Sequence, residues 1–165
     1  MLRGPALRLG DDLNTDVIIP ARFMQNWETL GDHVFEGESP DLPKRAKASK
    51  FVVAGKNFGC GSSREQAVMA IKQAGVQVVI AKSFARIFYR NAINLALPIL
   101  EADATDLPDG AEIEVDLVTG KITEVATGRV FQGKGLPPEA KAIVDAGGLI
   151  EHLKKRFAAE GKPGP

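Results

Sequence analysis

Residues 51–81 read FVVAGKNFGCGSSREQAVMAIKQAGVQVVIA, and this pattern predicts a βαβ unit. The run Phe51–Ala54 is apolar and is followed by a glycine, as expected of a buried strand, and residues 76–81 form a second such run. Between them, apolar residues recur at the helical spacing of three and four, which predicts a helix from about Ser62 that Gly75 ends. Strands joined through a helix are expected to be parallel, with a right-handed crossover.

The segments after this unit extend the α/β pattern and then change its character. Residues 84–95 are predicted to form a helix that leads to a third strand at 98–100. Beyond Asp109 the apolar residues alternate over short segments separated by turn residues, which predicts an antiparallel meander. Its expected strands cover residues 111–117, 121–126 and 128–132, and helices are expected at 137–146 and 149–159.

The first fifty residues carry weaker signals. Residues 11–22 contain turn formers followed by an apolar run. Residues 26–50 are polar enough to predict a loop, with one short helix near Trp27–Phe35. A loop of that length in a small domain is usually functional or disordered.

The length and the charge of the chain limit the classes of protein to which it can belong. The chain has 165 residues, of which 44% are hydrophobic, so one core can form, and we expect a single domain over residues 1–165 with 158–165 as a flexible tail. The 21 basic residues balance the 21 acidic ones, so no overall field favours nucleic acid or an anionic membrane. The start lacks the apolar run of a signal peptide, and no stretch could span a bilayer, so a cytoplasmic protein is expected.

Cys60 is the only cysteine. It excludes an internal disulfide, and one thiolate cannot by itself build a zinc site or an iron-sulfur cluster, so no metal is expected on this chain. As an alternative, Cys60 could be the nucleophile of a cysteine hydrolase, because a turn before a helix lowers a thiol pKa. The required base would have to be His33 or His152, which are the only histidines.

The glycine-rich turn at residues 55–65 is the first candidate site. A strand that ends where a helix begins points free backbone N–H groups at one spot, which suits a carboxylate or a phosphate. Ser62 and Glu65 also match a capping box with Ser62 as N-cap. Arg64 would then lie in the first helical turn, where the helix dipole disfavours a cation by about 0.3–1 kcal/mol, so an anion is expected beside it. The turn matches neither the Walker pattern nor the dinucleotide-binding glycine pattern.

A second junction follows the next strand. Lys82, Ser83 and Arg86 surround the start of the second helix, with Arg90 one turn further on. Ligands of open α/β sheets gather at the carboxyl ends of the strands, so two adjacent junctions would suit a polycarboxylate. The alternative for Arg86 and Arg90 is a solvated face or pairing with acidic side chains.

Three ordered motifs resemble a known family. The stretches NTDVIIP (14–20), GCGSSRE (59–65) and AKSFARIFYRN (81–91) look like the signature stretches of the isopropylmalate dehydratase small subunits. Those subunits correspond to the mobile swivel domain of aconitase. The resemblance implies an α/β swivelling domain with a parallel core sheet, flanking helices and additional antiparallel β hairpins.

The resemblance also implies a division of labour. The family's large subunit holds a [4Fe-4S] cluster, and the small subunit binds no cofactor and closes over it in a heterodimer or heterotetramer. The reaction interconverts 2-isopropylmalate and 3-isopropylmalate, which are small dicarboxylate hydroxy acids, by dehydration and rehydration in leucine biosynthesis. Ser62 resembles the general base and Arg64 the carboxylate-binding arginine. Substrate contacts are expected from Gly61 and Ser63, with support from Asp16, Lys82, Ser83 and Arg86.

Two departures from the family pattern bear on the site. Gln66 stands where relatives commonly have histidine. The loop associated with substrate choice reads Phe23-Met24-Gln25-Asn26, an uncharged lining that, with Trp27, suits an isopropyl group. The alternative is that Phe23 and Met24 pack in the core.

Other functions stay open on the sequence alone. The related substrates are homoaconitate, citraconate or methylmalate, and dimethylmalate. The competing class is a non-enzymatic carboxylate-binding module that would use the same helix starts without a cluster-bearing partner.

Overall fold

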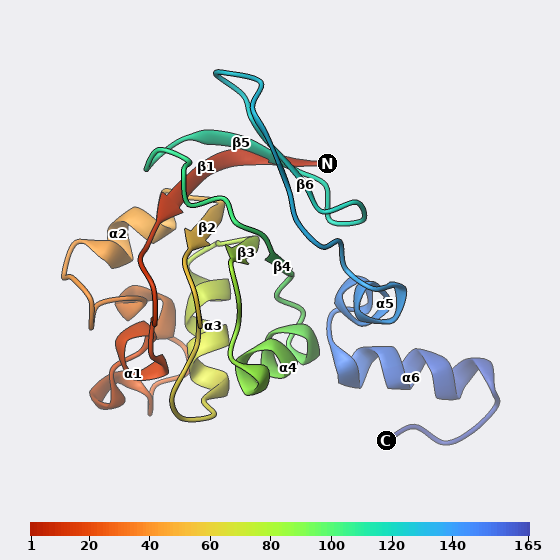
Figure 1. Ribbon diagram of the computed structural model, residues 1–165. Helices are drawn as coiled ribbons and strands as arrows, with labels where there is room; N and C mark the ends of the chain where they lie inside the picture. Colours follow the sequence, from red (N-terminus) through yellow and green to blue (C-terminus); the bar gives the residue numbers. More distant parts are fainter.

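A computed structural model describes residues 1–165 and contains one seven-stranded sheet with helices packed against it (Figure 1). The order of the strands across the sheet is β4-β3-β2-β1-β5-β6-β7. Four neighbouring strands, β1 to β4, are parallel, whereas β5, β6 and β7 form an antiparallel meander on the other side of β1. The strands are β1 (Leu2–Arg8), β2 (Phe51–Ala54), β3 (Val78–Ala81), β4 (Ile99–Glu101), β5 (Glu112–Val115), β6 (Lys121–Glu124) and β7 (Val130–Gln132). The predicted parallel core with added antiparallel hairpins is confirmed.

The helices occupy the connections between the parallel strands and the carboxyl end of the chain. They are α1 (Thr15–Ile18), α2 (Leu42–Lys47), α3 (Glu65–Gln73), α4 (Arg86–Asn94), α5 (Pro138–Ala146) and α6 (Leu149–Ala159), with 3-10 turns η1 (Ala21–Phe23) and η2 (Leu30–His33). The two C-terminal helices pack on each other and on α4, and neither contains a fully buried residue. None of these helices has the length and hydropathy that a bilayer crossing requires.

The βαβ unit has the predicted form. Phe51 pairs with Val78 in a parallel register, and every residue of β2 and β3 is buried. Burial on both faces explains why these strands have continuous apolar runs without alternation. They form the centre of a core of 38 buried hydrophobic residues.

Strand β1 is not predicted by the sequence pattern. It contains Gly4 and Pro5, which are depleted in central strands because proline cannot donate to the ladder. The structure resolves this conflict by changing the partner at Pro5: residues 2–5 pair with β5, and residues 6–8 pair with β2. The proline lies at the changeover between the two ladders.

The prediction of a loop over residues 26–50 is wrong in part. The short helix expected near Trp27–Phe35 is confirmed as η2, but α2 follows it, and several residues between them are buried. Helix α2 has only six residues, too few for a helical period to stand out. The buried residues of this segment include Leu30, Val34, Phe35, Leu42 and Ala46.

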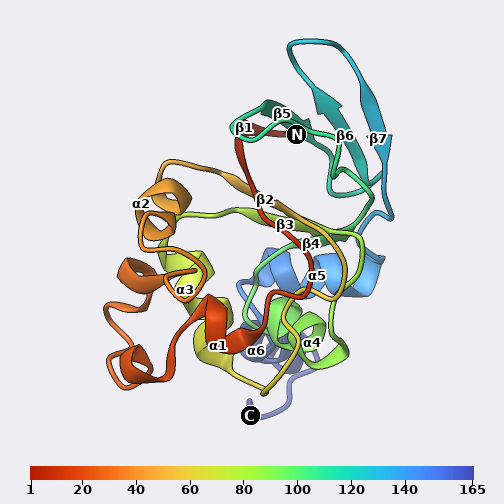
Figure 2. The ribbon, with the colours of Figure 1, turned by 60° about the vertical axis from the view of Figure 1, so that its left-hand side comes forward.

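The sheet curls so that its two ends approach each other (Figure 2). Lys134, just after β7, forms an isolated antiparallel bridge with Glu101 of β4. The Lys134 ammonium also pairs with the Glu101 carboxylate at 3.1 Å. This contact covers part of the free edge of β4, where unpaired backbone groups would otherwise be exposed.

Candidate functional site

The three motif segments lie side by side beyond the carboxyl ends of β1, β2 and β3. The Gly59 N–H donates to the Leu13 carbonyl at 2.8 Å, and Asn14 and Cys60 form a parallel bridge. On the other side, Phe58 and Phe84 form a second parallel bridge. These bridges continue the order of the strands past their ends. The glycine-rich turn at residues 55–65 and the basic junction that begins at Lys82 are therefore neighbours.

Two glycines and an aromatic cluster fix the shape of the turn. Gly59 has a φ of 80°, and a Cβ there would lie 2.2 Å from the Phe88 ring. Gly61 has a φ of 97°, and a Cβ there would lie 2.7 Å from the Asn14 amide oxygen. Below the turn, the Phe58 ring packs edge-on against Phe88 with centroids 5.2 Å apart. Only glycine combines these dihedrals with such close neighbours.

The predicted capping box is wrong. Helix α3 begins at Glu65, its N-cap is Arg64, and no side chain caps it. Ser62 is exposed in the turn before the helix. Arg64 is extended, with φ −123° and ψ 109°, so it lies outside the first helical turn, and the dipole argument for an anion beside it does not apply. The extended backbone instead turns the Arg64 side chain toward α1.

Free backbone donors provide a different reason to expect an anion. The N–H groups of residues 60–64 donate to no backbone carbonyl, and Gly61, Ser62 and Ser63 are exposed. A run of unpaired N–H groups in a turn forms a concave donor set for anions. The turn can therefore receive a carboxylate without losing any hydrogen bond of the fold.

Arg64 is held by α1. Its Nη1 lies 2.5 Å from the Asp16 carboxylate and donates to the Ile19 carbonyl at 3.4 Å. The Arg64 side chain is 18% exposed, against 59% for Asp16. Both contacts use Nη1, so Nε and Nη2 remain for a planar, two-point contact with a carboxylate. Asp16 thus orients the guanidinium beside the turn.

Thr15 is a candidate that the sequence pattern does not single out. Its backbone N–H donates to the Cys60 carbonyl at 2.8 Å, and its hydroxyl donates to the Ser62 carbonyl at 3.0 Å. It is 2% exposed and, with Glu124, is one of two buried polar residues in the chain. The only signal in the sequence is a threonine two residues before the apolar run 17–19, and this signal does not indicate that its partner is the Ser62 carbonyl.

The second junction contributes one side-chain contact to residues 60–64. Asn91 of α4 donates to the Ser63 hydroxyl at 3.4 Å. The other groups there have separate roles: the Ser83 hydroxyl accepts from the Asn57 N–H at 2.8 Å, and Lys82 pairs with Asp103 at 3.4 Å.

The two arginines of α4 make no ion pair. Arg86 and Arg90 are both exposed, and neither lies within ion-pair distance of a carboxylate. The solvated-face interpretation fits them, whereas pairing with acidic side chains within the chain does not. They add positive charge to the face of α4 without contacting the turn.

The loop at residues 23–26 is partly packed. The Phe23 ring stacks on His33 with centroids 3.6 Å apart, and the Arg22 guanidinium lies 4.6 Å from the same ring. Phe23 and Met24 pack against the core, whereas Gln25 and Asn26 are exposed. No hydrogen bond joins this loop to residues 61–64.

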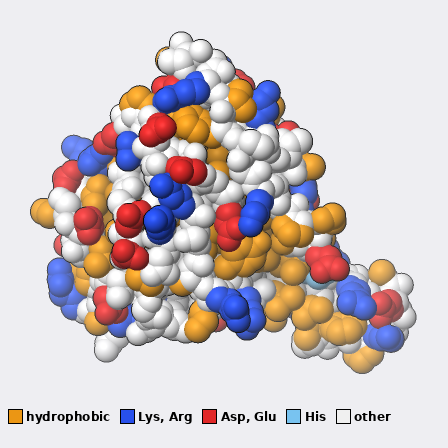
Figure 3. Space-filling model, in the orientation of Figure 1, with side chains coloured by type: hydrophobic (Ala, Val, Ile, Leu, Met, Phe, Trp, Pro, Cys, Tyr) orange, Lys and Arg blue, Asp and Glu red, His pale blue; other side chains and the backbone are white.

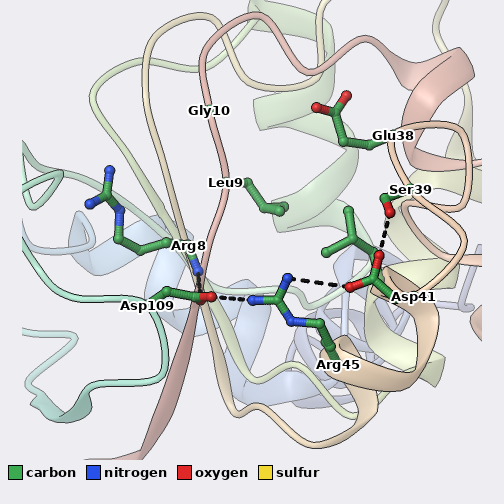
Figure 4. A pocket seen from close by; sticks show the side chains of 9 residues that line it. Arg8, Leu9, Gly10, Glu38, Ser39, Asp41, Arg45 and Asp109 are labelled. Atoms are coloured by element: carbon green, nitrogen blue, oxygen red, sulfur yellow. Dashed lines mark hydrogen bonds and ion pairs between the residues drawn. The ribbon is translucent and has the colours of Figure 1, made fainter.

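The cavities of this chain lie away from residues 61–64. One of about 410 Å³ lies between β1, α2 and Asp109 (Figure 4). Three of its charged side chains already pair with one another, since Arg45 contacts both Asp41 and Asp109, and the Arg8 backbone N–H also donates to Asp109. This cluster ties α2 to the sheet. Residues 61–64 line none of the cavities, so the turn stands on an open face.

The chain does not fit a resident metal cluster. No three histidine, cysteine, aspartate or glutamate side chains are grouped to hold a metal ion, and Cys60 is the only cysteine. A cysteine hydrolase also lacks its base, because His33 bonds to Glu36 at 2.7 Å and His152 lines a groove between α5 and α6. Neither ring hydrogen-bonds to Cys60.

Comparison with protein families and curated proteins gives one consistent result. Residues 14–104 match the family model described as the aconitase C-terminal domain. The chain is 49% identical over 157 residues to the 3-isopropylmalate dehydratase small subunit of Methanosarcina acetivorans, covering 93% of this chain and 97% of that protein. It is 50% identical over 163 residues to the protein of the same name from Aquifex aeolicus, covering 96% and 97%.

A relative with a broader name and a solved structure are also similar. The isopropylmalate/citramalate isomerase small subunit of Methanocaldococcus jannaschii is 46% identical over 162 residues, covering 96% of both chains. The crystal structure of a 3-isopropylmalate dehydratase from the same organism superposes with a TM-score of 0.91 at 42% identity, covering 96% of both chains. The fold is thus shared over nearly the whole length of the chain.

Proposed function

Since the chain belongs to the aconitase C-terminal domain family, among the small subunits of 3-isopropylmalate dehydratase, we propose that it provides half of a hydro-lyase site. The reaction is the interconversion of 2-isopropylmalate and 3-isopropylmalate in leucine biosynthesis, by loss and re-addition of water. This chain supplies Ser62 as the base and Arg64 as a carboxylate ligand.

The observation that carries the proposal is the turn at residues 60–64. It presents an exposed serine, unpaired backbone N–H groups and the Arg64 guanidinium. Asp16 holds this guanidinium through Nη1, so Nε and Nη2 remain available to donate to a carboxylate. A hydroxy dicarboxylic acid of this type offers two carboxylates for such donors. Of the two carbons between them, one bears the hydroxyl and the other carries the proton to be removed. Gly61 and Ser63 contribute backbone N–H groups to the same carboxylate contact.

The chemistry assigned to Ser62 is a proton transfer. Its deprotonated oxygen takes the proton from the carbon next to the one that bears the hydroxyl. The electrons of that C–H bond form the carbon–carbon double bond, and the hydroxyl leaves as water after protonation. A serine is a very weak base, so its oxyanion needs stabilisation from the free N–H groups of the turn and from the nearby cation. Hydration of the alkene reverses these steps at the neighbouring carbon.

The site requires a partner. The turn is on an open face and the chain cannot hold an iron-sulfur cluster, so the cluster and the groups that assist hydroxide departure belong to the large subunit. When that subunit docks, it covers the turn, excludes water and raises the strength of the Arg64 contact.

The choice of substrate rests on the loop at residues 23–26. Homoaconitate carries an additional carboxylate, and this loop has no cation to bind it. The half-buried Phe23 and Met24 leave Gln25 and Asn26 as the exposed members, so the loop presents no charge to pair with an ionised substituent and accommodates an uncharged one such as isopropyl. The name of the Methanocaldococcus relative supports citramalate, whose substituent is a methyl group, as the second candidate.

Anaerobic reconstitution with the cognate large subunit tests the proposal. We expect absorbance of the alkene intermediate to appear with 2-isopropylmalate only when both subunits are present. Citramalate and homoaconitate are offered separately, and a preference for either would keep the mechanism but change the substrate. If the two chains neither associate nor turn over any of these acids, this chain is a carboxylate-binding module without catalytic function.

A further inference from the structure

We propose that Thr15 is a positioning residue that sets the orientation of Ser62 through its side-chain hydroxyl. This inference rests on the proposed role of Ser62 as the base. Thr15 belongs to the stretch at residues 14–20, whereas Ser62 belongs to the stretch at residues 59–65, and Thr15 need not contact the substrate itself.

Residues 59–62 of the turn are attached to the segment that follows β1 through three hydrogen bonds. Two use backbone atoms only: the Gly59 N–H to the Leu13 carbonyl and the Thr15 N–H to the Cys60 carbonyl, both at 2.8 Å. Any residue except proline could make the bond from position 15. The third bond, from the Thr15 hydroxyl to the Ser62 carbonyl at 3.0 Å, is the one that requires this side chain.

The hydroxyl has no other role in the fold. Helix α1 is capped by Asn14, whose side chain accepts from the Asp16 N–H at 2.8 Å, so the start of the helix does not need the threonine hydroxyl. Thr15 is buried beside Ile18 and Ile19, where valine would fill the same volume without a polar atom. Burying a hydroxyl is unfavourable unless it is bonded, and its bond here goes to the Ser62 carbonyl.

Ser62 has no second anchor. It is exposed, belongs to no helix, and its N–H is unpaired, so rotation of the peptide planes on either side is opposed mainly by the Thr15 bond. The preceding residue, Gly61, has a φ of 97° and adds no side chain to restrict this rotation. Loss of the bond would let the Ser62 oxygen move away from the substrate carbon. A misplacement of about 1 Å can reduce the rate by roughly 100-fold.

The test compares Thr15→Val, Thr15→Ser and Thr15→Ala in complex with the large subunit. We expect Thr15→Val to lower kcat by about 10- to 100-fold with KM changed by less than about threefold, because binding through Arg64 is intact. Thr15→Ser keeps the hydroxyl and should stay within about threefold of the wild type. Serine and alanine both lack the methyl group, so their comparison isolates the hydroxyl even if valine is poorly accommodated.

A control and a double variant distinguish positioning from loss of structure. Thr127→Val removes another threonine hydroxyl bond, to Glu124 at 2.6 Å in the hairpin, and should leave kcat unchanged. Adding Thr15→Val to Ser62→Ala should lower turnover no further, because the serine oxygen to be positioned is already absent.

The outcomes separate this inference from the proposed function. Equal kcat for Thr15→Ser and Thr15→Ala, with Ser62→Ala inactive, would overturn the role of Thr15 and leave Ser62 as the base. Full turnover by Ser62→Ala would instead overturn the proposed function. A fall in kcat for Thr15→Ala that Thr15→Ser restores would establish the positioning role.

Discussion

Replacement of Ser62 by alanine should abolish turnover while leaving the fold almost unchanged. In the structure the Ser62 side chain is exposed and makes no hydrogen bond, and the N-cap of α3 is Arg64. The bond that involves residue 62 uses its carbonyl, which alanine retains. The substitution therefore removes one solvated hydroxyl and no packing.

The two expected magnitudes differ widely. An exposed substitution without a capping role changes the free energy of unfolding by less than about 0.5 kcal/mol. For a chain of this size, that corresponds to a shift in Tm of less than about 2 °C. Loss of a general base, in contrast, lowers kcat by about 10²- to 10⁴-fold.

The assay combines thermal unfolding of the isolated chain with turnover of the anaerobic complex, followed through the alkene intermediate. Ser63→Ala is the matched control, since its hydroxyl only accepts a long bond from Asn91 at 3.4 Å, and most of its kcat should remain. A drop in Tm of more than about 5 °C for Ser62→Ala would show that Ser62 is structural, and retention of more than about a tenth of kcat would refute its role as the base.

Three further perturbations test the site and the fold. Arg64→Lys should raise KM by about 10- to 100-fold with a smaller change in kcat, because lysine cannot make the two-point contact, and steady-state kinetics of the complex would measure it. Gly59→Ala should lower the free energy of unfolding by about 2–5 kcal/mol, because the residue has a positive φ and the new Cβ would clash with an aromatic ring. The control Gly75→Ala, which has a positive φ but open space around it, should lower it by only about 1–2 kcal/mol. Denaturant titrations measure both values. The Thr119 N–H, which donates to the Asp116 carboxylate, holds the pKa of Asp116 below its usual value. The ionised Asp116 therefore stabilises the folded chain above the unfolded pKa of about 4, and this stabilisation is lost as pH falls through the lower folded pKa. The difference in Tm between the wild type and Asp116→Ala should therefore be constant near neutral pH and shrink below about pH 4; a difference independent of pH would contradict this.

The C-terminal helices show where local patterns suffice. Helix α6 spans Leu149–Ala159, as its apolar spacing predicts, and α5 begins after a proline and ends at Gly147, which has a φ of 95°. Both ends are specified by neighbouring residues. Hydrophobic side chains still gather over this part of the surface (Figure 3), because the pair rests on α4 along one side only.

The βαβ unit, the meander and the family could be predicted from local sequence patterns, since each depends on residues close together in the chain. A strand buried on both faces must be apolar throughout, and ordered motifs need no three-dimensional information to be recognised. The bounds of β2 and α6 follow from such local rules. The chemical identities of Ser62 and Arg64 as candidates were likewise available from their motif.

The arrangement of those candidates depends on contacts between segments that are distant in the sequence. Helix α3 begins at Glu65, and not at the predicted Ser62, because the backbone of Arg64 is extended and its side chain pairs with Asp16, which lies 48 residues earlier in the sequence. Strand β1, with its glycine and proline, is central only because β2 and β5 pair with different halves of it. The hydroxyl of Thr15 meets the Ser62 carbonyl for the same reason. Contacts between residues distant in sequence arise when the sheet brings the strand ends together, and no local pattern records them.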